Sequence, residues 1–277
     1  MAVDLVDDVA LKDEAATQVS PRHRTQGLSP ARKVWRYVAM PLFLTIVLVG
    51  FYLYISGQEL DTIEARQLTR PIIQGRLTEH IYVSAISTFF VVLLAVPLGI
   101  LATRPSLQRF TPGIIGLGNF GQAIPSLGML TIINLFALTV TWLPSTGTVP
   151  AVLALVAYST LPILRNTMVG LRQVDPNLLE AGRGMGLSNF QVLRKIEMPL
   201  AVPVVLAGVR TALVINIGTA ALVFLYGAGG LGTLIFQGFQ LRREPILLTG
   251  AVLTATLALL VDYLAGLVEE WLTPRGI

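Results

Sequence analysis

Long apolar stretches separated by short polar segments dominate the chain from about residue 37 onward. A helix needs about 20 largely apolar residues to cross the hydrocarbon core of a bilayer. The stretches are continuous over that length, whereas strands of a membrane barrel alternate over about 10 residues. The pattern predicts an all-α membrane protein with six spanning helices, at Tyr37–Ile55, Ile81–Ala102, Ile114–Leu138, Val149–Val169, Ala201–Leu225 and Ile246–Val268.

The third stretch is the least regular of the six, because glycines and Pro125 interrupt it. Membrane helices tolerate such residues where neighbouring helices satisfy the freed backbone groups. Residues 1–33 mix acids, bases, Ser, Pro and Gln without apolar periodicity, which predicts a flexible cytoplasmic tail. The tail is too long for the charged head of a signal peptide, so we expect the first span to remain in the protein.

The composition supports a membrane protein. Hydrophobic residues make up 53% of the 277 positions and charged residues 13%, about half the charge that a soluble surface requires. Cysteine is absent and there are two histidines, which excludes disulfide scaffolds, thiolate metal sites, cysteine nucleophiles and histidine-rich metal centres. We expect neither a metal nor a cofactor.

The basic residues predict an orientation through the positive-inside bias. With a cytoplasmic N-terminus, thirteen of the twenty Lys and Arg residues fall in the inside segments 1–36, 103–113, 170–200 and 269–277. Five fall in the outside segments 56–80, 139–148 and 226–245. The sequence therefore predicts a multi-pass membrane protein with both termini cytoplasmic.

The inside segment 170–200 is longer than a connection requires and has the punctuation of two short helices. Asp175 is a good N-cap with Pro176 at the first helical position, and Gly186 is placed to end that helix in the left-handed conformation. Ser188 and Gln191 form a capping-box pattern for a second helix, which we expect Pro199 to end. From the residues alone, the segment fits a membrane-surface helix as well as a contact for a cytoplasmic partner.

A spaced motif in this segment carries a resemblance. It reads Glu180-Ala181-Gly182, three residues, Gly186, nine residues, Ile196, one residue and Met198-Pro199. It resembles the EAA loop of ABC-importer permeases, with Gly182 in place of the second Ala and Met198 in place of Leu. The resemblance implies a type I ABC-importer permease fold and a coupling helix that contacts an ATPase, through Glu180, Ala181, Gly182, Gly186, Leu187, Ile196 and Pro199.

The resemblance narrows to permeases of the osmoprotectant type, which import glycine betaine, choline or carnitine. The matching stretches are 78–80, 96–101, 122–127, 161–167, 207–212 and 227–232. The 161–167 stretch, Leu-Pro-Ile-Leu-Arg-Asn-Thr, separates this type from methionine permeases better than the other stretches do. The implied organisation is the tail 1–33, an extra helix and external loop over 34–77, and a permease domain over 78–272.

The chain has no Gly-x4-Gly-Lys-Ser/Thr loop to hold ATP. The resemblance therefore implies a transport subunit rather than an enzyme, with ATP hydrolysis in a partner. The implied partners are two cytoplasmic ATPase subunits, a second permease subunit (identical or a paralogue), an extracytoplasmic substrate-binding protein and membrane lipid, with no nucleic acid. The implied location is a bacterial or archaeal cytoplasmic (inner) membrane.

Charged and polar residues near the apolar stretches are further candidates. Arg165, Arg210 and Asp262 either reach the interface or pair for structure, with a gating role as the alternative. We expect Glu79 and His80, at the external start of the second span, to be solvated or capping residues. Polar or kinked positions that could line a translocation path are Gln122, Pro125, Ser126 and Asn166.

Gly229, Gly230 and Gly232 belong to a Gly-x-Gly-x-x-Gly element. That spacing binds dinucleotides only between a strand and a helix, whereas here it follows a membrane span. We expect a tight turn and close helix packing instead.

Two alternatives remain open besides the leading function. One is a permease of the same type for methionine or another small solute, and the other is a secondary transporter. Asp262 alone gives the latter poor support. An intramembrane enzyme would need paired acids or histidines within the bilayer, and the sequence has no such cluster.

Overall fold

The computed structural model describes residues 30–273, which form helices and short connections with no strand among them. The chain divides into two compact units, residues 1–42 and 43–277, and the division falls within α2 (Pro30–Ser56). The first unit is described only for its helical residues 30–42. The second holds the rest of α2 and every other element, and the all-α fold class is confirmed.

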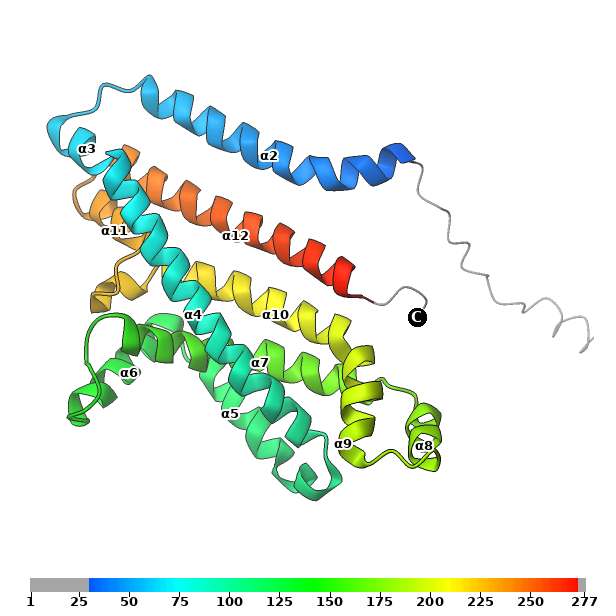
Figure 1. Ribbon diagram of the computed structural model, residues 1–277. Helices are drawn as coiled ribbons and strands as arrows, with labels where there is room; N and C mark the ends of the chain where they lie inside the picture. The colour runs from blue at the N-terminus through cyan, green and yellow to red at the C-terminus, as the bar shows by residue number, and fades with distance from the viewer. Residues whose placement is uncertain (1–29, 274–277) are drawn as a thin grey trace, which may run out of the picture. The chain divides into compact units, whose positions relative to one another are not determined.

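Four long helices form the second unit's frame: α4 (Arg70–Ala102), α7 (Thr148–Arg172), α10 (Met198–Ala220) and α12 (Glu244–Leu272) (Figure 1). Shorter elements join them: α3 (Thr62–Gln67), η1 (Pro105–Phe110), α5 (Thr111–Ala123), α6 (Ser126–Thr139), α8 (Pro176–Gly184), α9 (Asn189–Val192), the single π turn η2 (Leu193–Glu197), η3 (Val223–Tyr226) and α11 (Gly232–Gln240).

Five helices in the described residues are long and apolar enough to span a membrane. They are Tyr37–Ser56, Arg70–Ala102, Thr148–Arg172, Asn189–Ala220 and Glu244–Leu272. A sixth span exists only if the bent pair Pro105–Ala123 and Ser126–Thr139 is counted as one. The second span thus starts earlier than predicted, and the fifth helix ends at Ala220 rather than at position 225.

The predicted third span is broken, with its two halves bent by 106°. Ile124 is extended (ψ 130°), as the residue before a proline prefers, so α5 ends there and α6 starts after Pro125. Gly118 and Gly121 bring α5 against Leu161 and Ala157 of α7. The proline separates the two halves and the glycines allow α5 to approach α7 closely, so α5 and α6 pack on α7 as separate helices.

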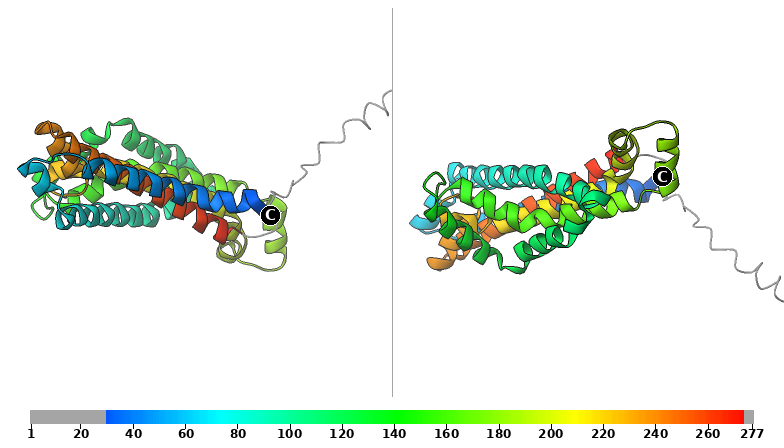
Figure 2. Two further views of the ribbon diagram at one scale, coloured as in Figure 1. Left: turned by 90° about the horizontal axis from the view of Figure 1, so that it is seen from above. Right: turned by 90° about the horizontal axis from the view of Figure 1, so that it is seen from below.

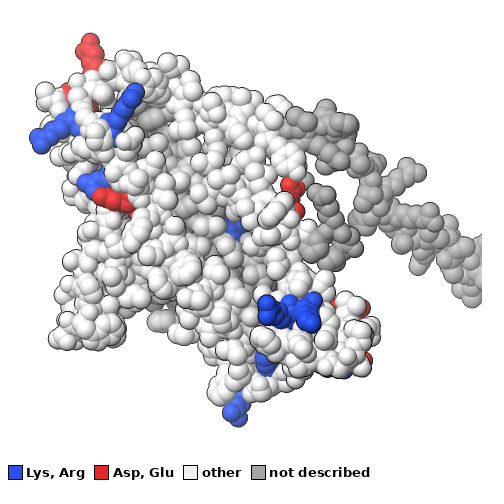
Figure 3. Space-filling view, in the orientation of Figure 1, with Lys and Arg blue, Asp and Glu red and all other residues white. Residues whose placement is uncertain are grey.

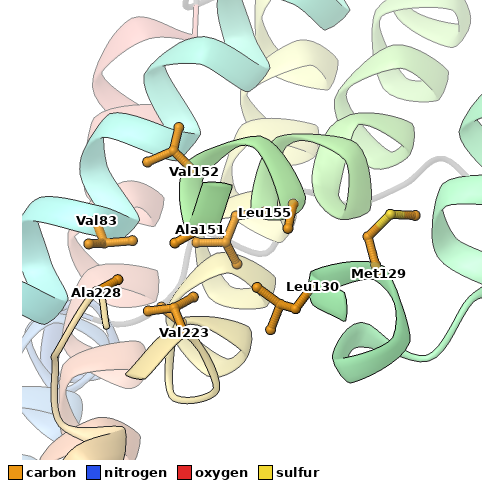
Figure 4. Packing of buried hydrophobic residues seen from close by; sticks show 10 residues of the cluster. Val83, Met129, Leu130, Ala151, Val152, Leu155, Val223 and Ala228 are labelled. Atoms are coloured by element: carbon orange, nitrogen blue, oxygen red, sulfur yellow. The ribbon is translucent and has the colours of Figure 1, made fainter. Parts of the chain in front are cut away.

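Helix α7 is the centre of the second unit, since α4, α5, α6 and α10 all pack against it. One apolar cluster joins Val83 of α4, Leu130 of α6, Leu155 of α7 and Val223 of η3 (Figure 4). A second cluster joins α4, α7 and α10 around Ile163 and Leu164, which are both buried. Helix α12 packs on α10 and α11.

Charged side chains gather at the two ends of the long helices. Figure 3 shows Lys and Arg around α8 and α9 at one end and around α3 at the other, with few charges between them. Helices α4, α7, α10 and α12 run lengthwise together, and α8 with α9 forms a lobe beyond one end of them (Figure 2). This distribution is typical of a bundle whose middle lies in lipid.

Candidate coupling segment and translocation path

The lobe at the α8–α9 end is built by local signals in residues 170–200. Asp175 caps α8, because its Oδ1 accepts the N–H of Asn177 at 2.9 Å. Gly186 has φ +85°, a conformation that costs other residues about 1–2 kcal/mol. Ser188 and Gln191 form the predicted capping box at α9. The caps and the left-handed turn predicted from the sequence are confirmed.

Gly182 is a packing position. It is buried, and a Cβ there would come within 2.6 Å of Ile196 Cδ1 and 3.6 Å of Leu187 Cδ1. In the sequence, Gly182 stands in place of the second Ala of the motif. The structure shows that the missing methyl makes room for Ile196, so α8 lies directly on the chain that leads into α10.

The outward face of α8 and its turn carries the remaining motif residues, Glu180, Ala181 and Gly186, which are exposed. Beside them lie three exposed apolar side chains, Leu178, Met185 (75% exposed) and Phe190 (68%). Leu187 is only half-buried and packs inward on Gly182. The exposed apolar surface of this lobe therefore comes from Leu178, Met185 and Phe190 more than from Leu187.

The sequence predicted that Pro199 ends a helix, but in the structure it does not. Residues 189–220 form one continuous helix in which η2 is a single wide turn, and Met198 N–H donates to Leu193 O, five residues back. Pro199 sits in the first turn of α10. The wide turn lets the chain pass a residue that has no N–H and that would clash in a regular helix. The candidate coupling segment is thus continuous with a helix long and apolar enough to span a membrane.

Three of the four path candidates meet at the break between α5 and α6. Gln122 lies in the last turn of α5, Pro125 is the N-cap of α6 and Ser126 begins that helix. Pro125 is exposed, whereas Gln122 and Ser126 are half-buried. The break places two helix ends, with their free backbone groups, at one corner.

The structure does not bring Asn166 to that corner. Gly121 at the end of α5 packs on Ala157 of α7, and Asn166 lies nine residues further along α7, a rise of about 13 Å. Its side chain packs on Gly208 of α10, where a Cβ would come within 2.8 Å of Asn166 Cβ. Arg165 turns the other way and donates from Nη2 to Asn119 Oδ1 at 2.6 Å.

Arg210 and Asp262 form an ion pair between α10 and α12. The Arg210 Nε lies 2.5 Å from Asp262 Oδ1, and Nη2 lies 2.6 Å from Oδ2. Glu269 adds a weaker contact at 3.7 Å from Nη1. Pairing for structure was one of the roles expected for Arg210 and Asp262, and the geometry shows this pairing.

The glycine turn between η3 and α11 is fastened to α4. Gly229 and Gly230 have φ +73° and +90°, and Gly230 N–H donates to Glu79 Oε2 at 2.8 Å. A Cβ at Gly232 would overlap the carbonyl oxygen of Ala221. The tight turn and the close packing expected at these glycines are both present. Glu79, which also pairs with Arg76 at 3.0 Å, anchors the turn.

The sequence suggested that His80 is a solvated or capping residue, but the structure buries it, with 1% of its surface exposed. Since α4 begins at Arg70, His80 lies about three turns inside the helix, where Nε2 donates to the carbonyl oxygen of Ile217 on α10 at 2.9 Å.

A buried hydrogen-bond network lies further along α4. Ser159 donates to Asn216 Oδ1 at 2.7 Å, and Asn216 Nδ2 donates to Thr88 Oγ1 at 2.8 Å, which joins α7, α10 and α4.

Comparison with known proteins places this geometry in a family. A model described as "binding-protein-dependent transport system inner membrane component" matches residues 95–274, which include α8, the π turn and the bent span. The chain belongs to this family. Its members are transport subunits, so family membership decides against the secondary-transporter and enzyme alternatives.

Individual relatives in this permease family are similar over most of their length. The glycine betaine/carnitine/choline transport system permease protein OpuCB of Bacillus subtilis is 40% identical over 201 residues, covering 72% of this chain and 88% of OpuCB. The osmoprotectant import permease protein OsmY of Salmonella typhimurium is 38% identical over 235 residues, covering 85% of this chain and 95% of OsmY. The alignment with OsmY is too long to fit after position 78, so it enters the segment expected to be an extension.

A solved permease supports the fold. A chain of the inward-facing MetNI methionine ABC transporter superposes with a TM-score of 0.68 at 23% identity, covering 75% of this chain and all of that chain. The type I ABC-importer permease fold is thus confirmed.

Three features of the family permease were missed from the sequence. The first is Phe190, which the structure leaves exposed. The sequence signal was an aromatic residue within the polar segment 170–200 that carries the EAA motif. The second is the Ser159–Asn216–Thr88 network, whose members are too far apart in sequence to be linked by a pattern. The third is Glu197, a buried acid within the motif's unassigned position before Met198.

Proposed function

We propose that this permease is the membrane subunit of an ATP-driven importer of osmoprotectants of the glycine betaine, choline and carnitine class. The observation that carries the proposal is the 40% identity to OpuCB over 88% of that relative. The 38% identity to OsmY, an osmoprotectant import permease, supports the same class. The Leu161–Thr167 stretch that suggested this class lies in α7, with Leu161, Ile163, Leu164 and Thr167 in the core.

The translocation path proposed here runs past the break between α5 and α6. Discontinuous membrane helices direct their free backbone ends toward polar solutes at the middle of a bilayer. Gln122, Pro125 and Ser126 occupy that break and are the proposed lining residues. Asn166 faces α10 and belongs to the proposed path only as a packing residue. Arg210 with Asp262, and the glycine turn at Gly229, Gly230 and Gly232, are proposed to hold the helices that move around the path.

The coupling contact proposed for the ATPase is the exposed lobe at α8. Glu180, Ala181 and Gly186 are exposed there, while Gly182 packs on Leu187 and Ile196, and Pro199 lies in the first turn of α10. A rigid lobe continuous with a membrane helix can bias a two-state transporter from its ATPase side. The proposed assembly has two ATPases, a second permease and a substrate-binding protein. Both termini lie on the cytoplasmic side, where most basic residues are.

The substrate class is tested by isolating the intact complex and screening its binding protein for ligands. Uptake of the same ligands is then measured in proteoliposomes. We expect binding and uptake of glycine betaine, choline or carnitine, with methionine inactive. Selective binding of methionine or of a sulfonate would replace the proposed class.

The coupling role is tested by Glu180→Lys and Gly186→Val, which change the lobe and leave the spans intact. We expect membrane insertion as before and loss of uptake. The permease purified without any co-purifying protein should hydrolyse no ATP. Full uptake by both variants would contradict the coupling assignment, and ATP turnover by the isolated chain would contradict the separate-ATPase assembly.

A further inference from the structure

Arg104 and Glu197 form a two-point ion pair at the α8–α9 end, outside every role assigned above. Arg104 Nη1 lies 3.1 Å from Glu197 Oε1, and Nη2 lies 2.5 Å from Oε2. The Glu197 side chain is 6% exposed and that of Arg104 is 27% exposed. A carboxylate buried to this degree requires its partner, because an unpaired buried charge costs several kcal/mol.

Each partner lies at a mechanical junction. Glu197 is the last residue of the π turn η2 and follows Ile196, which packs on Gly182 of α8. Arg104 is the N-cap of η1, two residues after α4 ends at Ala102. Its backbone is held by two hydrogen bonds, from Arg104 N–H to Leu101 O and from Leu107 N–H to Arg104 O. The pair therefore joins the coupling lobe to the corner where α4 ends and η1 begins.

The same corner controls the start of the bent span. Thr111, the first residue of α5, donates its buried hydroxyl to Ala102 O at the end of α4, at 2.7 Å. Helix α5 then leads to Gln122 and the break before α6. A continuous set of contacts thus runs from Gly182 through Ile196 and Glu197 to Arg104, and from there into α5.

We propose that the Arg104–Glu197 pair is the positioning contact through which movement of the α8 lobe reaches the α4–α5 corner and the bent span. The inference rests on the proposed function, since it takes α8 as the ATPase contact. A guanidinium bound at two points fixes both distance and orientation, so a shift of η2 moves η1 with it. An apolar cluster of Leu171, Ala201 and Val205 holds α7 to α10, and Ile100 of α4 and Leu193 of η2 also pack against it. The ion pair adds a direct, oriented tie between η2 and η1.

The test uses the complete complex of permease, ATPase and binding protein in proteoliposomes, with Glu197→Gln as the variant. We expect the complex to co-purify intact and its basal ATPase activity to persist. Uptake per ATP hydrolysed should fall by about ten-fold, within the usual range of coupling between sites. Arg109→Gln is the matched control, because Arg109 is an exposed charge of the same η1, and it should couple normally.

A second readout follows the motion itself. The chain has no cysteine, so Leu117→Cys places a single thiol on α5 at a side chain that is 75% exposed. Nucleotide should change the labelling rate of this thiol in the otherwise native permease and leave it unchanged when Glu197→Gln is added. A labelling rate that still responds to nucleotide, or unchanged uptake per ATP, would overturn the inference.

The double variant Arg104→Leu/Glu197→Leu separates positioning from folding. Replacing a buried ion pair with apolar side chains is often neutral for stability, so we expect an assembled, stable and uncoupled complex. Restored coupling would mean that the pair only neutralises a buried charge, which overturns the inference. Glu180→Lys is measured in parallel. If it keeps full uptake, the coupling assignment itself fails, whereas its loss of uptake beside a fully coupled Glu197→Gln overturns only the present inference.

Discussion

Arg210 on α10 grips both carboxylate oxygens of Asp262 on α12, while Glu269, two turns further along α12, stands at 3.7 Å from the same guanidinium. Gly266 lies between the two acids, and a Cβ there would come within 3.1 Å of Arg210 Nη1. Charges within spanning helices are costly unless they are paired. The ion pair and the close approach at Gly266 therefore both hold α12 against α10 at this site.

Asp262→Asn should lower the free energy of unfolding by about 1–2 kcal/mol, because it leaves Arg210 with the distant Glu269 alone. The estimate is modest because the Arg210 and Asp262 side chains are 38% and 31% exposed. Thermal unfolding in detergent measures the effect. Glu269→Gln should have a smaller effect, and equal destabilisation by the two variants would contradict the ranking of the two contacts.

Gly232→Ala should prevent the native packing of α11, since the added Cβ would overlap the backbone carbonyl of Ala221. Backbone cannot move aside as a side-chain end can, so we expect a loss of about 3 kcal/mol or more. Gly116→Ala is the control, because nothing lies within 4 Å of a Cβ at that helical position. Alanine there should stabilise α5 by up to about 1 kcal/mol. Similar melting temperatures for both variants would contradict the close approach.

Asn216→Leu should destabilise the α4–α7–α10 junction by about 1–2 kcal/mol, because the hydrogen bonds that join the three helices are lost. Ser159 and Thr88 then keep only their bonds to Leu155 O and Ser84 O in their own helices. The measurement is the melting temperature of the purified permease. Thr211→Val on the same helix removes only an exposed hydroxyl that bonds its own helix at Ala207 O, and it should melt as the native chain does. A small effect of Asn216→Leu would show that the network is dispensable for folding.

Gly186→Ala should weaken the turn after α8 by about 1–2 kcal/mol through backbone strain alone, since φ is +85° and nothing lies within 4 Å of the added methyl. Gly184→Ala, two residues earlier in α8 with equally open surroundings, should leave the turn intact. Uptake measured at equal membrane levels should fall for Gly186→Ala and persist for Gly184→Ala. The reverse order would show that backbone conformation at position 186 is unimportant.

Local punctuation was predictable from the sequence, because its physics involves few residues. The Asp175 cap, the Ser188–Gln191 capping box and the left-handed Gly186 all act within four positions. The sequence also located the interruption at Pro125. It could not give the 106° bend, because that depends on how Gly118 and Gly121 seat α5 on α7.

The errors arose where distant contacts or helix length decide the outcome. His80 looked like a residue at a span entrance because the apolar stretch starts at Ile81, but α4 extends back to Arg70 and buries it against Ile217. Pro199 looked like a helix stop because proline breaks a regular helix. The π turn that accommodates Pro199 is a backbone conformation that the residue types do not predict.

That wide turn has a mechanical consequence of its own. A π turn contains one residue more than an α-helical turn, and residues 193–197 hold that extra residue at the foot of α10. If the surplus passes one turn along the helix, the turn it leaves tightens, the hydrogen-bond count stays the same, and the residues between rotate by about 100°. The π turn before α10 therefore offers a way to rotate part of the helix without changing its length or breaking its hydrogen bonds.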